Sequence, residues 1–281
     1  MTEITPASTA HPFFMDAATG RRFCIYHPPS SKTACQGAII CVPPFGEEMN
    51  KSRRISANLA RTLASAGFGV LLIDLLGCGD SSGELKDATL AIWKQDIAMA
   101  KAWIERQVGV TASLWGLRLG ALLALDFARS SHSIERLVLW QPVLHGKSYL
   151  TQLLRTHLAA DLLEAGRSVS GTAELRNALL AGNSLEIAGY DIMPEMARAL
   201  DALNAEEFLL PPVRIDWFEV VSSADGRIPP ARIAIAERWK ANGVMVDIHA
   251  IHSQAFWSSQ EISEAPELVA ATFRVLTETI R

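Results

Sequence analysis

The chain has 281 residues, of which 49% are hydrophobic and 20% charged, a balance typical of a globular protein with one large core or with one core and an inserted subdomain. Its 26 Lys and Arg residues against 30 Asp and Glu residues give a net charge of −4, which offers no argument for binding nucleic acid. The longest apolar stretch, Phe68 to Leu76, is interrupted by Asp74 and is far shorter than the roughly 18 residues of a membrane span.

The N-terminal segment MTEITPASTAHPFF lacks the apolar region of a signal peptide, so we expect a cytoplasmic protein. The cysteines are sparse and irregularly spaced, at positions 24, 35, 41 and 78, without a CxxC or Cys/His ligand pattern. We therefore expect reduced thiols, and neither a metal nor a cofactor.

Short β-rich runs alternate with helical periodicity at both ends of the chain. The run AIICV at 38–42 is typical of a strand buried on both faces of a parallel sheet. In all, we expect strands at residues 22–26, 38–42, 69–74, 112–115, 136–140, 213–221 and 243–251. We expect helices between them, at residues 52–66, 89–107, 118–130, 229–241 and 265–280. Such repeated units predict an α/β fold with a mostly parallel twisted sheet and helices on both faces.

Residues 148–208 interrupt this alternation. Helices are expected there at 157–163, 172–180 and 194–204, without a convincing buried strand. An insertion of this length exceeds an ordinary connection within a compact domain. We therefore expect a helical cap at 148–208 over a core that is formed by residues 1–147 and 209–281.

The turn at residues 116–120, GLRLG, is the centre of the expected site. Its two glycines match the G-x-S-x-G nucleophile elbow, in which they permit a sharp turn and close packing of the helix on the sheet. Arg118 stands at the position of the serine. In an open α/β sheet, ligands bind beyond the carboxyl ends of the strands, where this turn lies.

Two further candidates follow later strands. Asp225 comes after the strand at 213–221, and His252 comes after the last strand, so the chain order is nucleophile position, acid, histidine. A turn aspartate is the alternative for Asp225. For His252 the alternatives are a core or capping histidine, and the nearby His249 competes for the same role.

These features resemble the α/β-hydrolase superfamily over most of the chain, and the superfamily implies hydrolysis of an acyl-type substrate such as an ester or thioester. Five runs are more specific, and they are similar to the exosortase A system-associated hydrolase 2 family: PPFGEEMNKSRR, DLLGCGDSSG, LWGLRLGA, WQPVLHG and SLEIAGYDI. That resemblance implies a bacterial protein linked to exopolysaccharide and protein-sorting systems.

Arg118 argues against ordinary acylation, because a guanidinium stays protonated and cannot attack a carbonyl. In one interpretation it grips an anionic small molecule, such as a carboxylate or phosphate, in a pocket that is also lined by Pro44, Phe45 and Leu119. In the other it is paired internally with Glu47 or Glu48, on the loop that would build the oxyanion hole.

Turnover without the serine would need another group. His252, oriented by Asp225, could act as general base on a water molecule while Arg118 stabilises the developing negative charge. A thiol nucleophile from Cys78 or Cys41 is a third hypothesis, and it requires a base or a positive dipole near the sulfur. The sequence thus leaves open an unconventional hydrolase, a pseudoenzyme that binds a ligand, and an interaction protein.

The segment after the oxyanion loop carries several basic residues. With a helix that begins at residue 52, Lys51, Arg53 and Arg54 lie in or beside its first turn and oppose its dipole. Glu47 and Glu48, or an anionic group of the substrate, could compensate for them, and a solvated cluster of ion pairs is the alternative interpretation of Lys51 and Arg53.

Overall fold

An eight-stranded sheet forms the centre of the structure, which is a computed structural model that describes residues 9–30, 35–131, 133–165, 171–221, 226–259, 261 and 263–278. The strands are β1 His11–Ala17, β2 Gly20–His27, β3 Gly37–Val42, β4 Phe68–Ile73, β5 Ala112–Leu117, β6 Arg136–Trp140, β9 Arg214–Val221 and β10 Met245–His252. Their order is β1-β2-β4-β3-β5-β6-β9-β10. β1 and β2 pair antiparallel to each other and β2 pairs antiparallel to β4, whereas the other pairs are parallel, as expected.

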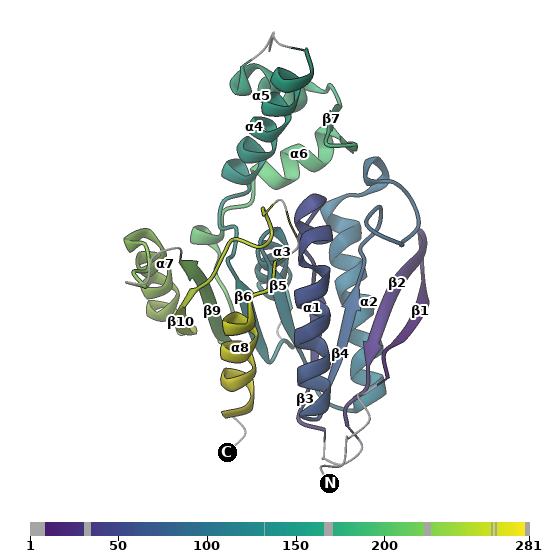
Figure 1. Cartoon of the computed structure of the whole chain (residues 1–281), viewed down its shortest axis with the longest axis vertical. Coiled ribbons are helices and arrows are strands. Elements are labelled where there is room, and N and C mark those ends of the chain that lie inside the picture. The colour runs from purple at the N-terminus through teal and green to yellow at the C-terminus, as the bar shows by residue number, and fades with distance from the viewer. Residues whose placement is uncertain are drawn as a thin grey trace.

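Helices cover both faces of the sheet (Figure 1). They are α1 Glu47–Ser65, α2 Leu90–Val108, α3 Leu119–Ala128, α7 Pro230–Ala241 and α8 Pro266–Glu278. One hydrophobic cluster joins α1 and α8 to one face, and a second joins α2, α3 and α7 to the other. β5 and β6 are therefore buried along their whole length, which explains their continuous apolar runs.

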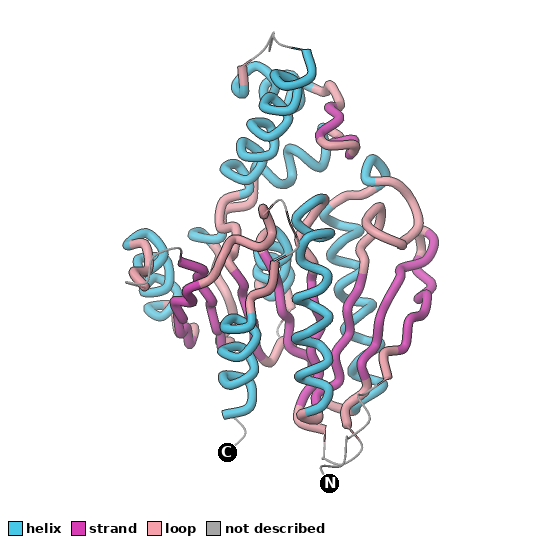
Figure 2. The backbone as a smooth tube through the Cα atoms, viewed as in Figure 1, coloured by secondary structure: helices cyan, strands magenta, loops and turns pink. Residues whose placement is uncertain are grey.

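A second group of elements lies beyond the carboxyl ends of the parallel strands (Figure 1). It consists of α4 Gly146–Ala165, α5 Thr172–Ala181, α6 Pro194–Asp201 and the antiparallel hairpin of β7 Leu185–Ile187 and β8 Tyr190–Ile192. Three helices were expected there, and the hairpin, whose strands have one buried residue each, was not predicted (Figure 2). Each hairpin strand has only three residues, too few for a recognisable alternation, and the turn at Ala188 and Gly189 has positive φ at both positions.

Helix α1 begins at Glu47, five positions before the start that the apolar spacing predicted. Gly46 makes this start possible, because it adopts φ 58° at the N-cap. The first turn therefore carries Glu47 and Glu48, which favour the helix dipole. Arg53 and Arg54 lie further along the helix and pair with acidic residues, so they do not oppose the dipole at its N-terminus.

Strand β1 and the short 3₁₀ helices η1 Leu85–Asp87 and η2 Ala205–Glu207 were not predicted. β1 lies at the edge of the sheet and is partly exposed, so its sequence lacks the apolar run of the central strands. None of the helices in the described part of the chain combines the length and hydropathy that crossing a bilayer requires.

Candidate functional site

The turn between β5 and α3 has the geometry of a nucleophile elbow. Arg118 adopts φ 55° and ψ −117°, a backbone region that residues other than glycine rarely occupy and that costs about 1–3 kcal/mol. Its N–H donates to the Trp140 carbonyl at 3.0 Å, and its own carbonyl accepts from Ala121 and Val143 at 3.1 and 3.2 Å. These hydrogen bonds fix the strained residue in place.

The glycines that flank Arg118 allow close packing. A Cβ on Gly120 would lie 2.2 Å from the Val42 carbonyl oxygen and 2.4 Å from that of Pro43. A Cβ on Gly116 would lie 2.5 Å from the Cα of Ala121. The role that the sequence analysis gave to these glycines is therefore confirmed.

The Arg118 side chain is buried and engaged on all sides. Its Nε donates to Glu48 Oε1 at 3.0 Å, its Nη1 to the Gln141 carbonyl at 3.5 Å and its Nη2 to Gln152 Oε1 at 3.4 Å. The guanidinium also lies over the Trp257 ring, with its Cζ 5.3 Å from the ring centroid. Internal pairing with Glu47 or Glu48 was one of the two interpretations of Arg118, and Glu48 is the partner.

Glu48 carries a buried carboxylate at the start of α1. Burial raises its pKa, and the positive charge of Arg118 and an interaction with Tyr149 offset that rise only in part. Burial, followed by the charge of Glu48, raises the pKa of Tyr149 well above its ordinary value. The Tyr149 hydroxyl and the Glu48 carboxylate are both buried and interact with each other.

A cavity of about 250 Å³ lies beside this ion pair, between the start of α1, helix α4, the β7–β8 hairpin and the loop after β10. Phe45, Tyr190 and Trp257 supply aromatic walls. From α4, residues 149, 152, 153 and 156 line it, a spacing that places them on one face of the helix.

The pocket residues that the sequence predicted fall into three places. Phe45, Glu47 and Glu48 line this cavity. Pro44 lines a separate cavity of about 160 Å³ beside β4 and α1, and Leu119 is buried at the start of α3 with 1% exposure. Glu47 is exposed and accepts a hydrogen bond from the Asn50 amide at 3.3 Å.

Of the expected histidine and acid, only His252 is among the described residues. His252 ends β10 beside Val221 and is exposed, whereas Asp225 lies outside the described residues. Trp257 is the residue of the loop after β10 that packs on Arg118. The partnership of Asp225 with His252 therefore stays a prediction.

A different histidine is paired with an aspartate. His249 Nε2 lies 3.4 Å from Asp216 Oδ1, and Asp216 also pairs with Arg136. Asp216 is near the beginning of β9, whereas the elbow follows the end of β5. This cluster links β6, β9 and β10, and the strand register places Asp216 level with Trp115 and His249 level with Leu117 of β5.

The cysteines do not provide a nucleophile. Burial raises the pKa of both Cys41 and Cys78 to about 12, so both thiols stay protonated at neutral pH. An activated cysteine requires the opposite shift. We therefore discard the hypothesis of a displaced thiol. Among the described residues, no group of histidine, cysteine and acidic side chains is arranged to hold a metal ion.

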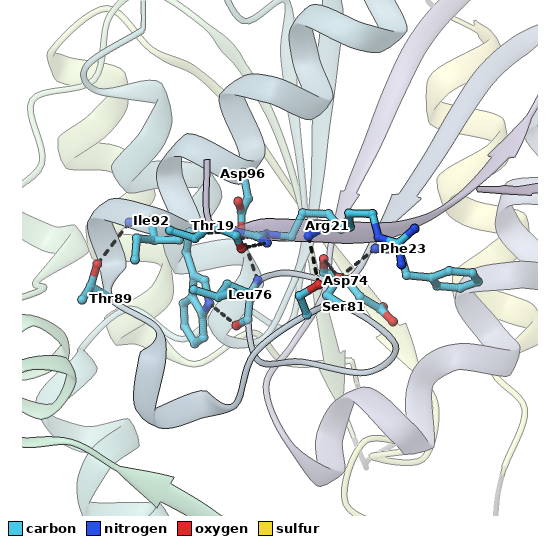
Figure 3. Close-up of polar contacts among 12 residues, drawn as sticks. Thr19, Arg21, Phe23, Asp74, Leu76, Ser81, Thr89, Ile92 and Asp96 are labelled. Carbon is cyan, nitrogen blue, oxygen red and sulfur yellow. Dashed lines mark hydrogen bonds and ion pairs between the residues drawn. The ribbon is translucent and has the colours of Figure 1, made fainter. Parts of the chain in front are cut away.

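Hydrogen bonds fix the position of the glycine-rich loop that follows β4 (Figure 3). Asp74 Oδ2 accepts from the Asp80 N–H at 3.0 Å and from Arg53 at 2.8 Å, and Ser81 accepts from the Phe23 N–H at 2.8 Å. Asp96 on α2 accepts from the Leu76 N–H at 2.9 Å. The run DLLGCGDSSG thus fastens this loop to β2 and α2.

Sequence reasoning missed the polar residues that complete the surroundings of Arg118. Gln141 follows β6, and Tyr149 and Gln152 lie on the first turns of α4. No motif marks them. The only signal available was the run WQPVLHG, which ends where α4 begins.

Residues 34–210 match the family described as serine aminopeptidase, S33. The comparison with curated proteins gave no match. Among solved structures, the chain resembles Est1E from Butyrivibrio proteoclasticus with ferulic acid bound, at 16% identity and a TM-score of 0.64 over 95% of this chain and 97% of that chain.

It also resembles a thermostable carboxyl esterase from Bacillus coagulans, at 12% identity and a TM-score of 0.66 over 97% of this chain and 99% of that chain. A thioesterase domain from the curacin biosynthetic pathway matches at 12% identity and a TM-score of 0.55 over 96% and 99% of the two chains. At these identities the likeness concerns the fold.

Proposed function

Because the chain belongs to the serine aminopeptidase S33 family and has the α/β-hydrolase fold, with Arg118 where the family's nucleophile would stand, we propose that it binds a neutral acyl-type small molecule and forms no acyl-enzyme at residue 118. The observation that carries this proposal is the state of Arg118. Each of its side-chain nitrogens donates to a protein oxygen, and Glu48 neutralises its charge.

The proposed ligand site is the cavity beside the Arg118–Glu48 pair. We treat residues 148–208 as a helical cap on a core of residues 1–147 and 209–281, so that both parts contribute walls to this cavity. A concave, mostly apolar site with a few polar groups is the usual form of a small-molecule pocket.

The charges around the cavity favour a neutral ligand over the anionic one that the sequence analysis considered. Glu47 and Glu48 are opposed by Lys51 and Arg118, so the formal charges cancel. Arg118 is engaged by its protein partners and is not among the residues that line the cavity. A free carboxylate or phosphate would therefore lack a bidentate partner there.

The resemblance to the exosortase A system-associated hydrolase 2 family supports a more specific setting. We propose a cytoplasmic protein that handles an ester- or thioester-type molecule for exopolysaccharide or protein-sorting systems. The five sequence runs that carry this resemblance include Glu47, Glu48, Arg118 and Gln141, which are all residues of the site or its surroundings.

The proposal is tested with a serine-directed fluorophosphonate probe and a panel of neutral acyl compounds. We expect no phosphonate adduct on the peptide that contains residue 118, by peptide mass spectrometry. We also expect compounds from the panel to raise the melting temperature, because a ligand that binds only the folded state stabilises it. An adduct on that peptide, or steady release of acid from the panel, contradicts non-covalent binding.

A second candidate function is hydrolysis by water with His252 as general base. The position of His252 at the carboxyl end of β10 favours it, since ligands bind at that end of the sheet. Turnover that His252→Ala abolishes would support this candidate. Arg118→Ser gives a further test, because esterase activity in this variant requires a histidine within reach of the new hydroxyl. We expect none, because Trp257 packs on residue 118 from the loop that follows His252.

A further inference from the structure

Strand β10 lies at one side of the central sheet and has a free edge (Figure 1). Within the described part of the chain it pairs with β9 alone, over all eight of its residues and without a bulge. Its sequence, MVDIHAIH, contains neither proline nor lysine, which commonly keep an exposed edge from pairing. β1 at the opposite side carries a proline, Pro12. β10 is therefore the edge that is better suited to accept another strand.

The hydrogen bonds to β9 show which backbone groups of β10 face outward. The N–H of Met245 donates to the Val213 carbonyl at 3.1 Å, and the N–H of Ser253 donates to the Val221 carbonyl at 3.3 Å. Both donors have odd numbers, and the parallel register between them is continuous. Because backbone groups alternate in direction along a strand, the N–H and C=O groups of residues 246, 248, 250 and 252 face the free edge.

Side chains along this edge are exposed and partly apolar. Met245 is 60% exposed, and Ile233 on α7, the helix that packs on β10, is 44% exposed. The side chains of Asp247 and His249 are 58% and 29% exposed, so both can be reached from outside the molecule. An edge strand with exposed apolar side chains is a template for pairing with a further strand.

We propose that β10 pairs antiparallel with β10 of a second copy of this chain, about a twofold axis at Ile248, and that the two sheets thereby join into one. A twofold dimer is the commonest assembly of identical chains, and it uses the same surface of both copies. In an antiparallel pair, residues whose backbone groups face outward oppose each other. An axis at Ile248 meets this condition, because residue 248 opposes its own copy and residue 246 opposes residue 250 of the second copy.

The cross-strand pairs about this axis match in charge and in polarity. Asp247 of each copy stands opposite His249 of the other, so an acid–histidine pair occurs twice on one face of the joined sheet. Met245 stands opposite Ile251 of the second copy on the same face. On the other face Ile248 meets its own copy, so apolar contacts accompany the polar pairs.

The neighbouring axes that the outward-facing groups allow lack the acid–histidine pair. An axis at Ala250 places Asp247 opposite Ser253 of the second copy, and an axis at Val246 places it opposite Met245. Charge complementarity therefore selects the axis at residue 248.

The first measurement is the mass of the wild-type protein in solution by sedimentation equilibrium over a wide range of concentrations. We expect a mass that rises to twice the 30.6 kDa of one chain. A mass of 30.6 kDa at every concentration up to about 100 µM overturns the proposal.

Asp247→Lys replaces the acid opposite His249 of the second copy by a cation. We expect it to weaken dimerisation at least about 10-fold, because the favourable pair is lost twice. Asp16→Lys is the matched control, since it makes the same charge change on an exposed side chain of β1, at the opposite edge of the sheet, and it should leave the dissociation constant within about twofold. Circular dichroism verifies that both variants fold.

Ile248→Cys tests the register. The axis brings residue 248 and its copy to a Cα–Cα distance of about 5.5 Å, which a disulfide can span. We expect a covalent dimer on a non-reducing gel after oxidation with copper phenanthroline. Ala250→Cys is the matched control, because this exposed position stands opposite Val246 of the second copy and should cross-link no more than the wild-type cysteines do.

The outcomes distinguish this interface from other contacts. A dimer that Asp247→Lys weakens and that Ile248→Cys traps supports the proposal. A dimer that Asp16→Lys disrupts and Asp247→Lys does not, or cross-linking through Ala250→Cys but not through Ile248→Cys, overturns it. Neither result bears on the proposed ligand site, since none of these four residues lines its cavity.

Discussion

Arg118 and Glu48 form a buried ion pair whose two halves depend on each other. Their side chains are 10% and 15% exposed, so a lone charge at either position would be poorly solvated. The pair explains how a guanidinium is accommodated at the bottom of a turn that in this fold usually presents a small hydroxyl.

Glu48→Ala should therefore destabilise the protein by about 3 kcal/mol, because it leaves the Arg118 charge buried without its partner. The measurement is urea denaturation near neutral pH. Glu47→Ala is the control from the same helix turn, and its exposed side chain should contribute less than about 1 kcal/mol. Equal losses of unfolding free energy in the two variants would mean that the Arg118–Glu48 pair contributes no more to stability than the exposed Glu47.

For the individual residues around position 118, the sequence predicted the type of interaction but not all of the side chains that take part in it. The arginine at the elbow, the internal pairing with an acidic residue and the two glycines follow from the motif and from the cost of a buried charge. Tyr149, Gln152 and Trp257 could not be placed, because their position beside Arg118 depends on how α4 and the loop after β10 fold over the sheet.

At the scale of elements, α3 is held unusually close to the sheet. All ten of its residues are buried, and the chain passes from β5 into it through the strained turn. Gly120 is the contact point with the carbonyl oxygens that end β3.

Gly120→Ala should cost at least about 2 kcal/mol, because the added Cβ meets backbone oxygens that cannot move without displacing β3 or α3. Thermal and urea denaturation give the measurement. Gly171→Ala is the control, since a Cβ there meets no atom within 4 Å, and it should change stability by less than about 1 kcal/mol. A mild effect at position 120 would show that the helix has room to shift.

The cluster around Asp216 ties β6, β9 and β10 together. Burial alone would raise the pKa of Asp216, but hydrogen bonds with His249 and Arg136 and the charges of Arg136 and Arg214 hold it below its ordinary value of 3.8. A carboxyl group whose pKa is lowered by folding stabilises the folded state above its unfolded pKa. That contribution is lost as the pH falls through the folded pKa.

Asp216→Asn should therefore destabilise the protein by about 3 kcal/mol at pH 7, because it leaves Arg136 buried without its carboxylate. The difference from wild type should narrow as the pH falls below 3.8. Unfolding free energies from pH 7 to pH 3 give the measurement. Asp247→Asn removes an exposed partner of Arg214 and should have a small effect throughout. If the difference in unfolding free energy between wild type and Asp216→Asn stays constant with pH, ionisation of Asp216 does not stabilise the fold.

The central elements were predictable because periodicity and burial act on many residues at once. The strands β3 to β6, β9 and β10 and the helices between them lie close to the predicted positions. The edge strand β1, the β7–β8 hairpin and the early start of α1 were not, because they depend on a few residues and on single backbone angles such as φ 58° at Gly46.

Across the whole molecule, Arg118 connects the sheet to the elements above it. Its Nη2 reaches Gln152 on α4, while its Nε holds Glu48 at the start of α1. These contacts join the elbow residue to two of the elements that line the cavity.

Arg118→Ala should accelerate amide hydrogen exchange in the first turns of α4, because the side chain that bridges to this helix is lost. Exchange in β3 and β6 should change little, and mass spectrometry resolves the segments. Arg176→Ala is the control, because it removes an ion pair to Asp201 that lies between α5 and α6. Unchanged exchange at α4 in Arg118→Ala would argue that other contacts alone hold the helix.

The positive φ at residue 118 is held by groups other than the side chain at that position. The hydrogen bonds that hold this bend involve main-chain atoms of Trp140, Ala121 and Val143, and the flanking glycines supply the clearance. None of these depends on the side chain at position 118. The bend would therefore persist with a different residue at position 118, and the identity of that residue is constrained by neighbours such as the buried Glu48.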